Sequence, residues 1–374
     1  MRQIVLFWAS CWSVLAFLFL PFTYNFLPKV GVGLSTFILP INKQICAWFG
    51  VEVQKTYLIS DSLAFYSTAF ILLLFSGLIT ALVYWRLKRV IPKAQQVLLN
   101  LMVLLLAFFL IRYGLDKIFD RQFYTPASNT LHTPMGQLSK DILFWSSMGT
   151  SSFYNYFMGI VEVLAGTLLF FNRTRFLGLL MAFGIFGNIL AINIGFDITV
   201  KYLSGLLLFT SAICLLFYSD SLKTLLTGKS AEKEPLILSN VWVLILFTPF
   251  IVDLGMTYLE NPKNESGQSY HVLSIDSPSE LIDEAEIVRI HLHPAGYFIT
   301  EDKQQHFTSY KMSADRKFVI VNQQLVPFSF QGDFLNWREG EKIIRWKLKE
   351  IDLEELPLKQ DETNWYFESV GGLY

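Results

Sequence analysis

Ionisable side chains inside apolar stretches have the greatest capacity for chemistry in this chain. One such stretch carries Arg112 and Asp116 four residues apart, followed directly by Lys117, and a later one carries Glu162. Residues four apart lie on one face of a helix, so Arg112 shares a face with Asp116, and Tyr113 shares one with Lys117. A charge among apolar residues in a membrane is costly, and each of these residues is therefore a functional candidate.

A second set of polar residues follows further along the chain. Asn188 and Asn193 lie in another apolar stretch, and Asp197 and Lys201 lie in the turn after it. At a rise of about 1.5 Å per residue, the spans predicted below place Glu162 about 13 Å from the outer end of its helix. The charges therefore gather in the outer half of the membrane. This pattern predicts an outward-opening polar cavity that holds a quinone ring, a lipid headgroup or a small anion.

Glu162 and Lys117 are the candidates for catalytic groups, because a carboxylate and an amine are able to exchange protons with a bound quinone. We expect Glu162 to pair with Arg112. The ligand-binding candidates are Arg112, Tyr113, Asp116, Asn188, Asn193, Asp197 and Lys201. The alternative is that the buried charges form a satisfied ion-pair network that fixes helix packing. Lys117, Asp197 and Lys201 then act as anchors at the membrane interface.

Histidine and cysteine support little further chemistry. No histidine lies in a predicted span, which excludes a bis-histidine membrane haem. His291 and His293 alternate in a way that places both on one strand face, but no third ligand is indicated, and we predict no metal site. The cysteines Cys11, Cys46 and Cys214 are far apart in the sequence and are interpreted as apolar filling residues.

Composition identifies the class of protein. Hydrophobic residues make up 53% of the 374 residues and charged residues only 16%, whereas a soluble domain has about 25% charged residues. The net charge of −1 and the lack of a basic stripe exclude a nucleic-acid binder. The chain is predicted to be an α-helical polytopic membrane protein in a lipid bilayer.

Seven stretches approach the roughly 20 apolar residues that a bilayer-spanning helix needs. They are residues 3–22, 63–84, 97–119, 153–171, 176–193, 200–218 and 236–254. Lys and Arg are concentrated in the loops 85–96, 172–175 and 219–235, which are therefore predicted to be cytoplasmic. The prediction is a bacterial inner-membrane protein with a cytoplasmic N-terminus. The segment 30–45, in the outer loop 24–62, is too short to span and either lies along the interface or dips into it.

A change in charge marks the main domain boundary. Residues 1–259 hold 18 Lys and Arg against 11 Asp and Glu, whereas residues 260–374 hold 12 against 20. The second region alternates in short runs between turns, which is typical of a small antiparallel β-domain. We predict two N-terminal spans in 1–96, a membrane core in 97–218 and the last span in 219–259. An extracytoplasmic β-rich domain occupies 260–374.

The membrane core resembles the DoxX family of small four-helix membrane proteins. The matching residues are Arg112-Tyr-Gly-Leu-Asp-Lys117, Thr133-Pro-Met-Gly136, Gly159 to Thr174, and Asn193-Ile-Gly-Phe-Asp-Ile-Thr-Val-Lys201. The flanking spans and the outer β-domain are similar to longer bacterial versions of the family. The resemblance implies a four-helix bundle in 97–218.

The resemblance also implies a possible activity. The family is named after a subunit of a thiosulfate:quinone oxidoreductase, and other members are linked to thiol or quinone redox balance. One hypothesis is therefore a redox subunit that binds quinone and needs a partner subunit for electron transfer. The other hypothesis is a non-catalytic membrane scaffold whose domain 260–374 docks an envelope partner.

Overall fold

A computed structural model describes residues 2–20, 28–53, 61–123, 125–219, 267–277, 279, 281 and 287–356. The chain divides into two compact units. The first comprises Met1–Ile118 with Phe157–Asn261, and the second comprises Phe119–Tyr156 with Pro262–Tyr374. The segment 119–156 thus belongs with the C-terminal region, although it lies between two helices of the membrane core in the sequence.

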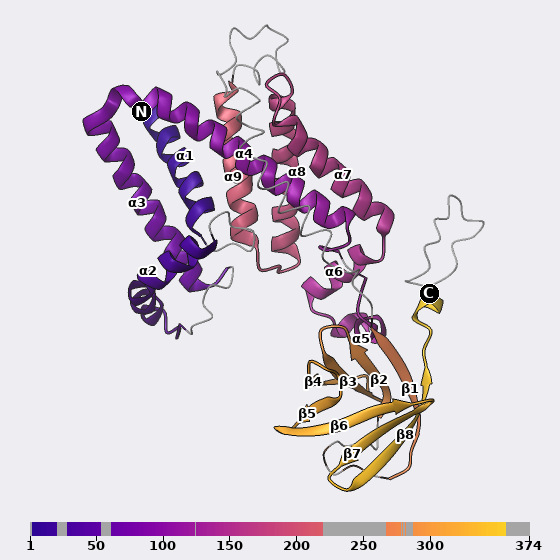
Figure 1. Ribbon diagram of the computed structural model, residues 1–374. Helices are drawn as coiled ribbons and strands as arrows, with labels where there is room; N and C mark the ends of the chain where they lie inside the picture. Colours follow the sequence, from indigo (N-terminus) through magenta and orange to yellow (C-terminus); the bar gives the residue numbers. More distant parts are fainter. Residues whose placement is uncertain are drawn as a thin grey trace, which may run out of the picture. The chain divides into compact units, whose positions relative to one another are not determined.

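Helices make up the described part of the first unit (Figure 1). They are α1 (Arg2–Phe19), α2 (Pro28–Trp48), α3 (Leu63–Leu87), the short η1 (Lys88–Val90), α4 (Ile91–Ile118), α7 (Ser152–Leu168), α8 (Arg175–Gly195) and α9 (Lys201–Phe217). Three of them, α3, α4 and α8, are long and apolar enough to cross a membrane, and α1 and α9 contain shorter apolar helices. This confirms a helical protein with membrane-spanning candidates. The predicted span 236–254 and most of the loop 219–235 lie outside the described residues.

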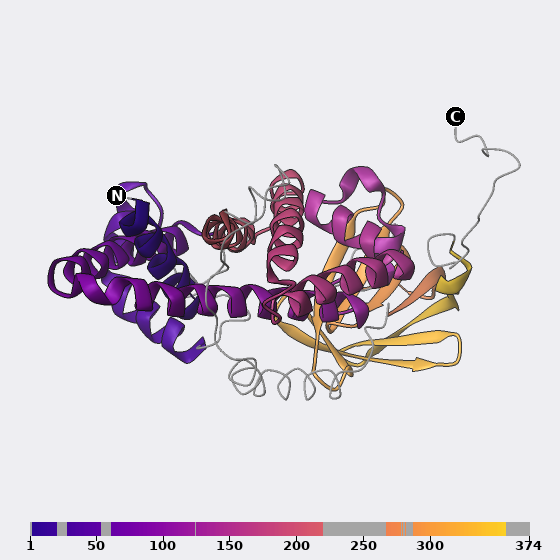
Figure 2. The same ribbon diagram turned by 90° about the horizontal axis from the view of Figure 1, so that it is seen from above.

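The helix α4 lies at the centre of the first unit. Figures 1 and 2 show it as the long helix that runs past α1, α9 and α7. Most residues of the apolar part of α4 are buried, because this helix is apolar on every side and is covered by neighbouring helices. Met102, Leu106 and Phe109 of α4 form the middle of the core together with Phe17 of α1 and Phe186 of α8.

The segment 30–45 forms most of α2, which is a helix of 21 residues with Pro40 inside it. Asn42 of this helix is buried and bonds to α3. Its Nδ2 donates to Thr68 Oγ1 at 2.8 Å, and its Oδ1 accepts from Ser67 Oγ at 2.6 Å. These hydrogen bonds satisfy a buried amide and fix α2 against α3.

The second unit contains a closed β-barrel and several short helices. The eight antiparallel strands pair in sequence order, and β8 closes on β1. They are β1 (Gln268–Ile275), β2 (Ile287–His293), β3 (Tyr297–Asp302), β4 (Phe307–Met312), β5 (Phe318–Val321), β6 (Gln324–Gln331), β7 (Phe334–Glu339) and β8 (Lys342–Glu350). The predicted C-terminal β-rich domain is confirmed, and closure removes the exposed edges of an open sheet.

Alternation along the strands builds the core of the barrel. Phe298, Trp337 and Trp346 are fully buried, and the rings of the two tryptophans lie 6.0 Å apart. The strand β8 alternates between exposed and buried residues over most of its length, as a strand with one face on a core requires.

The segment between the predicted spans 97–119 and 153–171 contains helices. They are α5 (Ser128–His132), the short η2 (Met135–Gln137) and α6 (Lys140–Gly149). The strands β1 and β2 contact α5, so this segment covers part of the outside of the barrel. The hydropathy pattern missed these helices because each is short and only partly apolar.

Candidate functional site

The backbones of α4 and α7 touch at a pair of glycines. A Cβ atom on Gly159 would lie 2.6 Å from the carbonyl oxygen of Gly114, and one on Gly114 would lie 2.7 Å from that of Gly159. Two turns further along α7, a Cβ on Gly166 would lie 2.7 Å from Ile111 Cγ1. Small residues thus let α4 and α7 approach closely, and a larger side chain at these positions does not fit without a shift.

The close contact brings Lys117 and Glu162 together. Lys117 Nζ donates to Glu162 Oε2 at 2.8 Å, and the two residues are 4% and 0% exposed. The expected pairing of Glu162 with Arg112 is wrong. Lys117 is five residues after Arg112 and therefore lies on a different part of the surface of α4. This part of α4 contacts Glu162 on α7.

Arg112 pairs instead along its own helix. Its Nε lies 3.4 Å from Asp116 Oδ2, and both side chains are buried. The spacing of four residues thus places the two groups on one face as predicted. Tyr113 lies beside the cluster, with Lys117 Nζ 5.8 Å from the centroid of its ring. We call Arg112, Asp116, Lys117 and Glu162 the charge cluster.

The Glu162 carboxylate has an open hydrogen-bonding capacity. Glu162 Oε1 is buried and has no hydrogen-bond partner among the described residues. A carboxylate oxygen of this kind accepts a hydrogen bond from any hydroxyl that reaches it. The cluster therefore combines two ion pairs with a buried carboxylate oxygen that is able to accept a further hydrogen bond.

The remaining site candidates lie on α8 and at the turn between α8 and α9. Asn193 is buried, and its Nδ2 donates to Ser204 Oγ at 3.0 Å. Lys201 Nζ lies 2.7 Å from Asp197 Oδ1, and the Asp197 side chain is 82% exposed. Asn188 is exposed on α8. The described contacts of this group run to α9 and to Asp61, so the structure does not join it to the charge cluster.

Asp61 is a functional position that sequence reasoning missed. It precedes α3, yet its carboxylate accepts from the backbone amides of Lys201 at 2.7 Å and Tyr202 at 3.0 Å. These amides begin α9 and have no acceptor within the helix, so Asp61 caps it from 140 residues away. Its φ of 62° is a left-handed conformation that aspartate tolerates. No local motif signals such a cap.

Removing this cap has a measurable cost. Asp61→Ala is expected to lower the free energy of unfolding by about 1 kcal/mol, because two amides at the start of α9 lose their acceptors. Asp61→Asn retains one acceptor oxygen, so its midpoint of thermal unfolding should lie between those of the Asp61→Ala protein and the parent. The measurement is thermal unfolding of the full chain. An Asp61→Ala protein as stable as the parent would contradict the capping role.

The barrel unit contains a second buried polar cluster. Ser269, His291 and Glu301 lie on neighbouring strands and are all fully buried. The hydrogen bonds join Ser269 Oγ to His291 Nδ1 at 2.7 Å and His291 Nε2 to Glu301 Oε2 at 3.1 Å. Arg289 Nη1 donates to Glu301 Oε1 at 2.6 Å.

These residues face away from the barrel core and toward α5, whose His132 ring centroid lies 5.3 Å from that of His291. The cluster therefore helps to hold α5 on the barrel. His293 is not part of this cluster. Its Nδ1 accepts a hydrogen bond from the backbone amide of Ala295 at 3.0 Å. No group of three residues suited to hold a metal ion occurs among the described residues.

Burial makes the barrel unit sensitive to acid. Burial lowers the pKa of His291, an effect larger than the opposing hydrogen bond to Glu301. The folded protein thus takes up this proton at lower pH than the unfolded chain, so stability is lost as pH falls below about 6.5, the usual value for histidine. His132, Arg289 and Glu301 are the other charged or titratable groups near this ring.

We expect thermal unfolding of the barrel, followed by tryptophan fluorescence, to shift to lower temperature between pH 7.5 and pH 5. His291→Gln should weaken this pH dependence, whereas His306→Gln, at a position whose side chain is 73% exposed, should retain it. An identical pH profile in the His291→Gln protein would contradict the assignment.

Together, the apolar helices and the buried charge cluster define a membrane protein with a helical bundle and a separate C-terminal β-barrel unit. The chain belongs to the family of the uncharacterized protein YwoB of Bacillus subtilis. It is 34% identical to that protein over 121 residues, which are 30% of this chain and 71% of YwoB. No family model matches the chain. No solved structure matches it either.

Proposed function

We propose that this protein is a non-catalytic, DoxX-like membrane scaffold whose barrel unit docks an envelope partner. The observation that carries the proposal is the burial of the charge cluster. Lys117 and Glu162 lie 2.8 Å apart at a helix contact with no room for a further side chain. A buried and mutually paired cluster stabilises one helix arrangement, and this is the role of an interhelical lock.

The DoxX-like segments and the expected membrane topology also support a scaffold. The motif from Arg112 to Lys117 and the stripe from Gly159 to Gly166, which carry the DoxX resemblance, are the two segments that meet at this contact. The topology that the Lys and Arg distribution favours places the N-terminus in the bacterial cytoplasm and the barrel unit outside the inner membrane. There the barrel is available to a partner in the envelope.

A redox subunit is the second candidate, and one observation favours it. Glu162 Oε1 is buried without a described partner and would accept a hydrogen bond from a quinol hydroxyl. In this candidate Lys117 holds the carboxylate in place, and the electrons pass to a partner subunit. The free cysteines Cys11, Cys46 and Cys214 are all buried, which disfavours a thiol-linked variant of this function.

The experiment that separates the two candidates uses Glu162→Gln in the full-length protein. The scaffold requires lower thermal stability with an unchanged set of small molecules in mass spectrometry of the gently purified protein. It also requires that a second protein co-purifies through residues 260–374 of the parent. A stoichiometric quinone in the parent that is lost in a folded Glu162→Gln protein would establish the redox candidate instead.

A further inference from the structure

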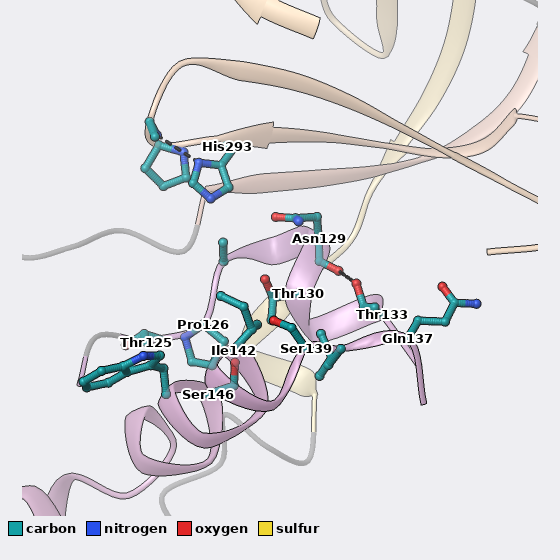
Figure 3. Close-up of a pocket in the computed structure, with 15 residues that line it drawn as sticks. Thr125, Pro126, Asn129, Thr130, Thr133, Gln137, Ser139, Ile142, Ser146 and His293 are labelled. Atoms are coloured by element: carbon teal, nitrogen blue, oxygen red, sulfur yellow. Dashed lines mark hydrogen bonds between the residues drawn. The ribbon is translucent and has the colours of Figure 1, made fainter. Parts of the chain in front are cut away.

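The second unit contains a cleft of about 810 Å³ between the helices α5 and α6 and the turn that joins β2 to β3 (Figure 3). This size is within the range of about 300–1,000 Å³ that small-molecule sites occupy. All the lining residues of the cleft belong to the unit that carries the barrel, whereas the charge cluster belongs to the first unit. Binding of a ligand in this cleft does not depend on the function of the membrane helices.

The lining of the cleft is uncharged and combines polar side chains with apolar ones. Hydroxyl and amide side chains line the cleft, among them Thr130, Ser146, Asn129 and Gln137, and none of the fifteen described lining residues is Asp, Glu, Lys or Arg. An ionic ligand placed in such a site would lose water without gaining a countercharge. A ligand rich in neutral hydroxyl groups exchanges its hydrogen bonds with water for equivalent ones here.

Two lining residues show which hydrogen bonds are available. Figure 3 shows the side chain of Asn129 extending from α5 toward the turn that carries His293. Asn129 Oδ1 is a buried acceptor with no partner among the described residues. Rotation of the amide about its last side-chain torsion directs this oxygen to a donor in the cleft, and a ligand hydroxyl is such a donor.

His293 supplies a donor on the opposite wall. Its Nδ1 accepts the backbone amide of Ala295, so the proton of the neutral ring is on Nε2. Burial lowers the pKa of His293, which keeps this ring neutral at physiological pH. The cleft therefore offers an acceptor from α5 and a donor from the β2–β3 turn, the combination that a hydroxyl group satisfies in both directions.

The cleft also has an aromatic wall. Trp145 of α6 lines it, and this indole packs against Phe123, with ring centroids 5.3 Å apart. A rigid aromatic ring gives a large apolar contact area at a low entropy cost. Sugar rings carry hydroxyls around their edge and apolar C–H groups on their faces, and they match a polar lining with one aromatic wall.

We propose that this cleft binds an uncharged saccharide, with Asn129 and His293 as hydrogen-bonding residues and Trp145 as the stacking surface. A ligand of two sugar rings suits a cleft of this size. Affinity is expected to be weak, about millimolar, because the contacts are few and neutral.

The test is saturation-transfer NMR on the full-length protein in a detergent without a sugar headgroup, such as an amine oxide. The probes are two neutral disaccharides, maltose and N,N′-diacetylchitobiose. Fully deacetylated chitobiose is the cationic control, and cellobiouronic acid is the anionic control. We expect transfer to at least one neutral probe and at least tenfold weaker binding of both charged ones.

Variants locate the binding. Asn129→Ala and Trp145→Ala are expected to weaken binding of the neutral probe by about tenfold or more, a change of about 1.4 kcal/mol. Gln137→Ala, at an exposed position, gives a third test that does not endanger folding. Ser146→Ala and Ser147→Ala are a matched pair, since Ser146 lines the cleft and its exposed neighbour Ser147 does not.

The proposal is overturned by any of three results. One is no transfer to either neutral disaccharide, and another is equal binding of the charged controls. The third is binding that survives each of Asn129→Ala, Trp145→Ala and Gln137→Ala. None of these results bears on the charge cluster, whose test is the stability and small-molecule content of the Glu162→Gln protein.

Discussion

Replacing Lys117 by methionine is expected to lower the free energy of unfolding by about 3–5 kcal/mol, because Glu162 then remains buried with an uncompensated charge. The two side chains are 5% and 1% exposed and lie 2.8 Å apart, so solvent does not take the place of the lost partner. The measurement is the unfolding of the full-length protein in detergent, followed by circular dichroism against temperature and denaturant.

Lys201→Met is the matched control for this variant. Lys201 also pairs with a carboxylate at 2.7 Å, but its partner Asp197 is 82% exposed, and exposed ion pairs contribute little. The double variant Lys117→Met with Glu162→Leu removes both charges and should recover much of the lost stability. The interhelical lock is refuted if Lys117→Met is no more destabilising than Lys201→Met.

The second large effect concerns the glycine contact. Gly159→Ala places a methyl group 2.6 Å from the carbonyl oxygen of Gly114, a separation that requires the backbones of α4 and α7 to move apart. Overpacking of this kind costs about 1–3 kcal/mol. The shift also lengthens the contact between Lys117 and Glu162, so the total loss is expected at the upper end of this range.

Gly205→Ala on α9 provides the comparison. No atom lies within 4 Å of a Cβ added at this helical position, and alanine is the better helix former, so this variant is expected to be neutral or stabilising. Thermal unfolding of the two variants side by side gives the answer. Equal stability of the two proteins would show that α4 and α7 do not depend on this contact.

Local sequence indicated the long apolar helices and the strands of this protein. Long apolar runs such as 63–84 predict helices that a bilayer accommodates, because a helix satisfies its own backbone hydrogen bonds. Alternation in 342–348 predicts a strand in the same local way, since the side chains of a strand alternate between its two faces. The spacing of Arg112 and Asp116 likewise predicted that they share a helix face, because one helix contains both.

The tertiary structure decided which elements meet. Hydropathy contains no information on the rotation of α4 against α7, and that rotation brings Lys117 rather than Arg112 to Glu162. The capping of α9 by Asp61 and the closure of β8 on β1 also join residues far apart in the sequence. The cleft with Asn129 and His293 arises in the same way. Such contacts depend on how whole elements pack, and no local pattern of residue types specifies that packing.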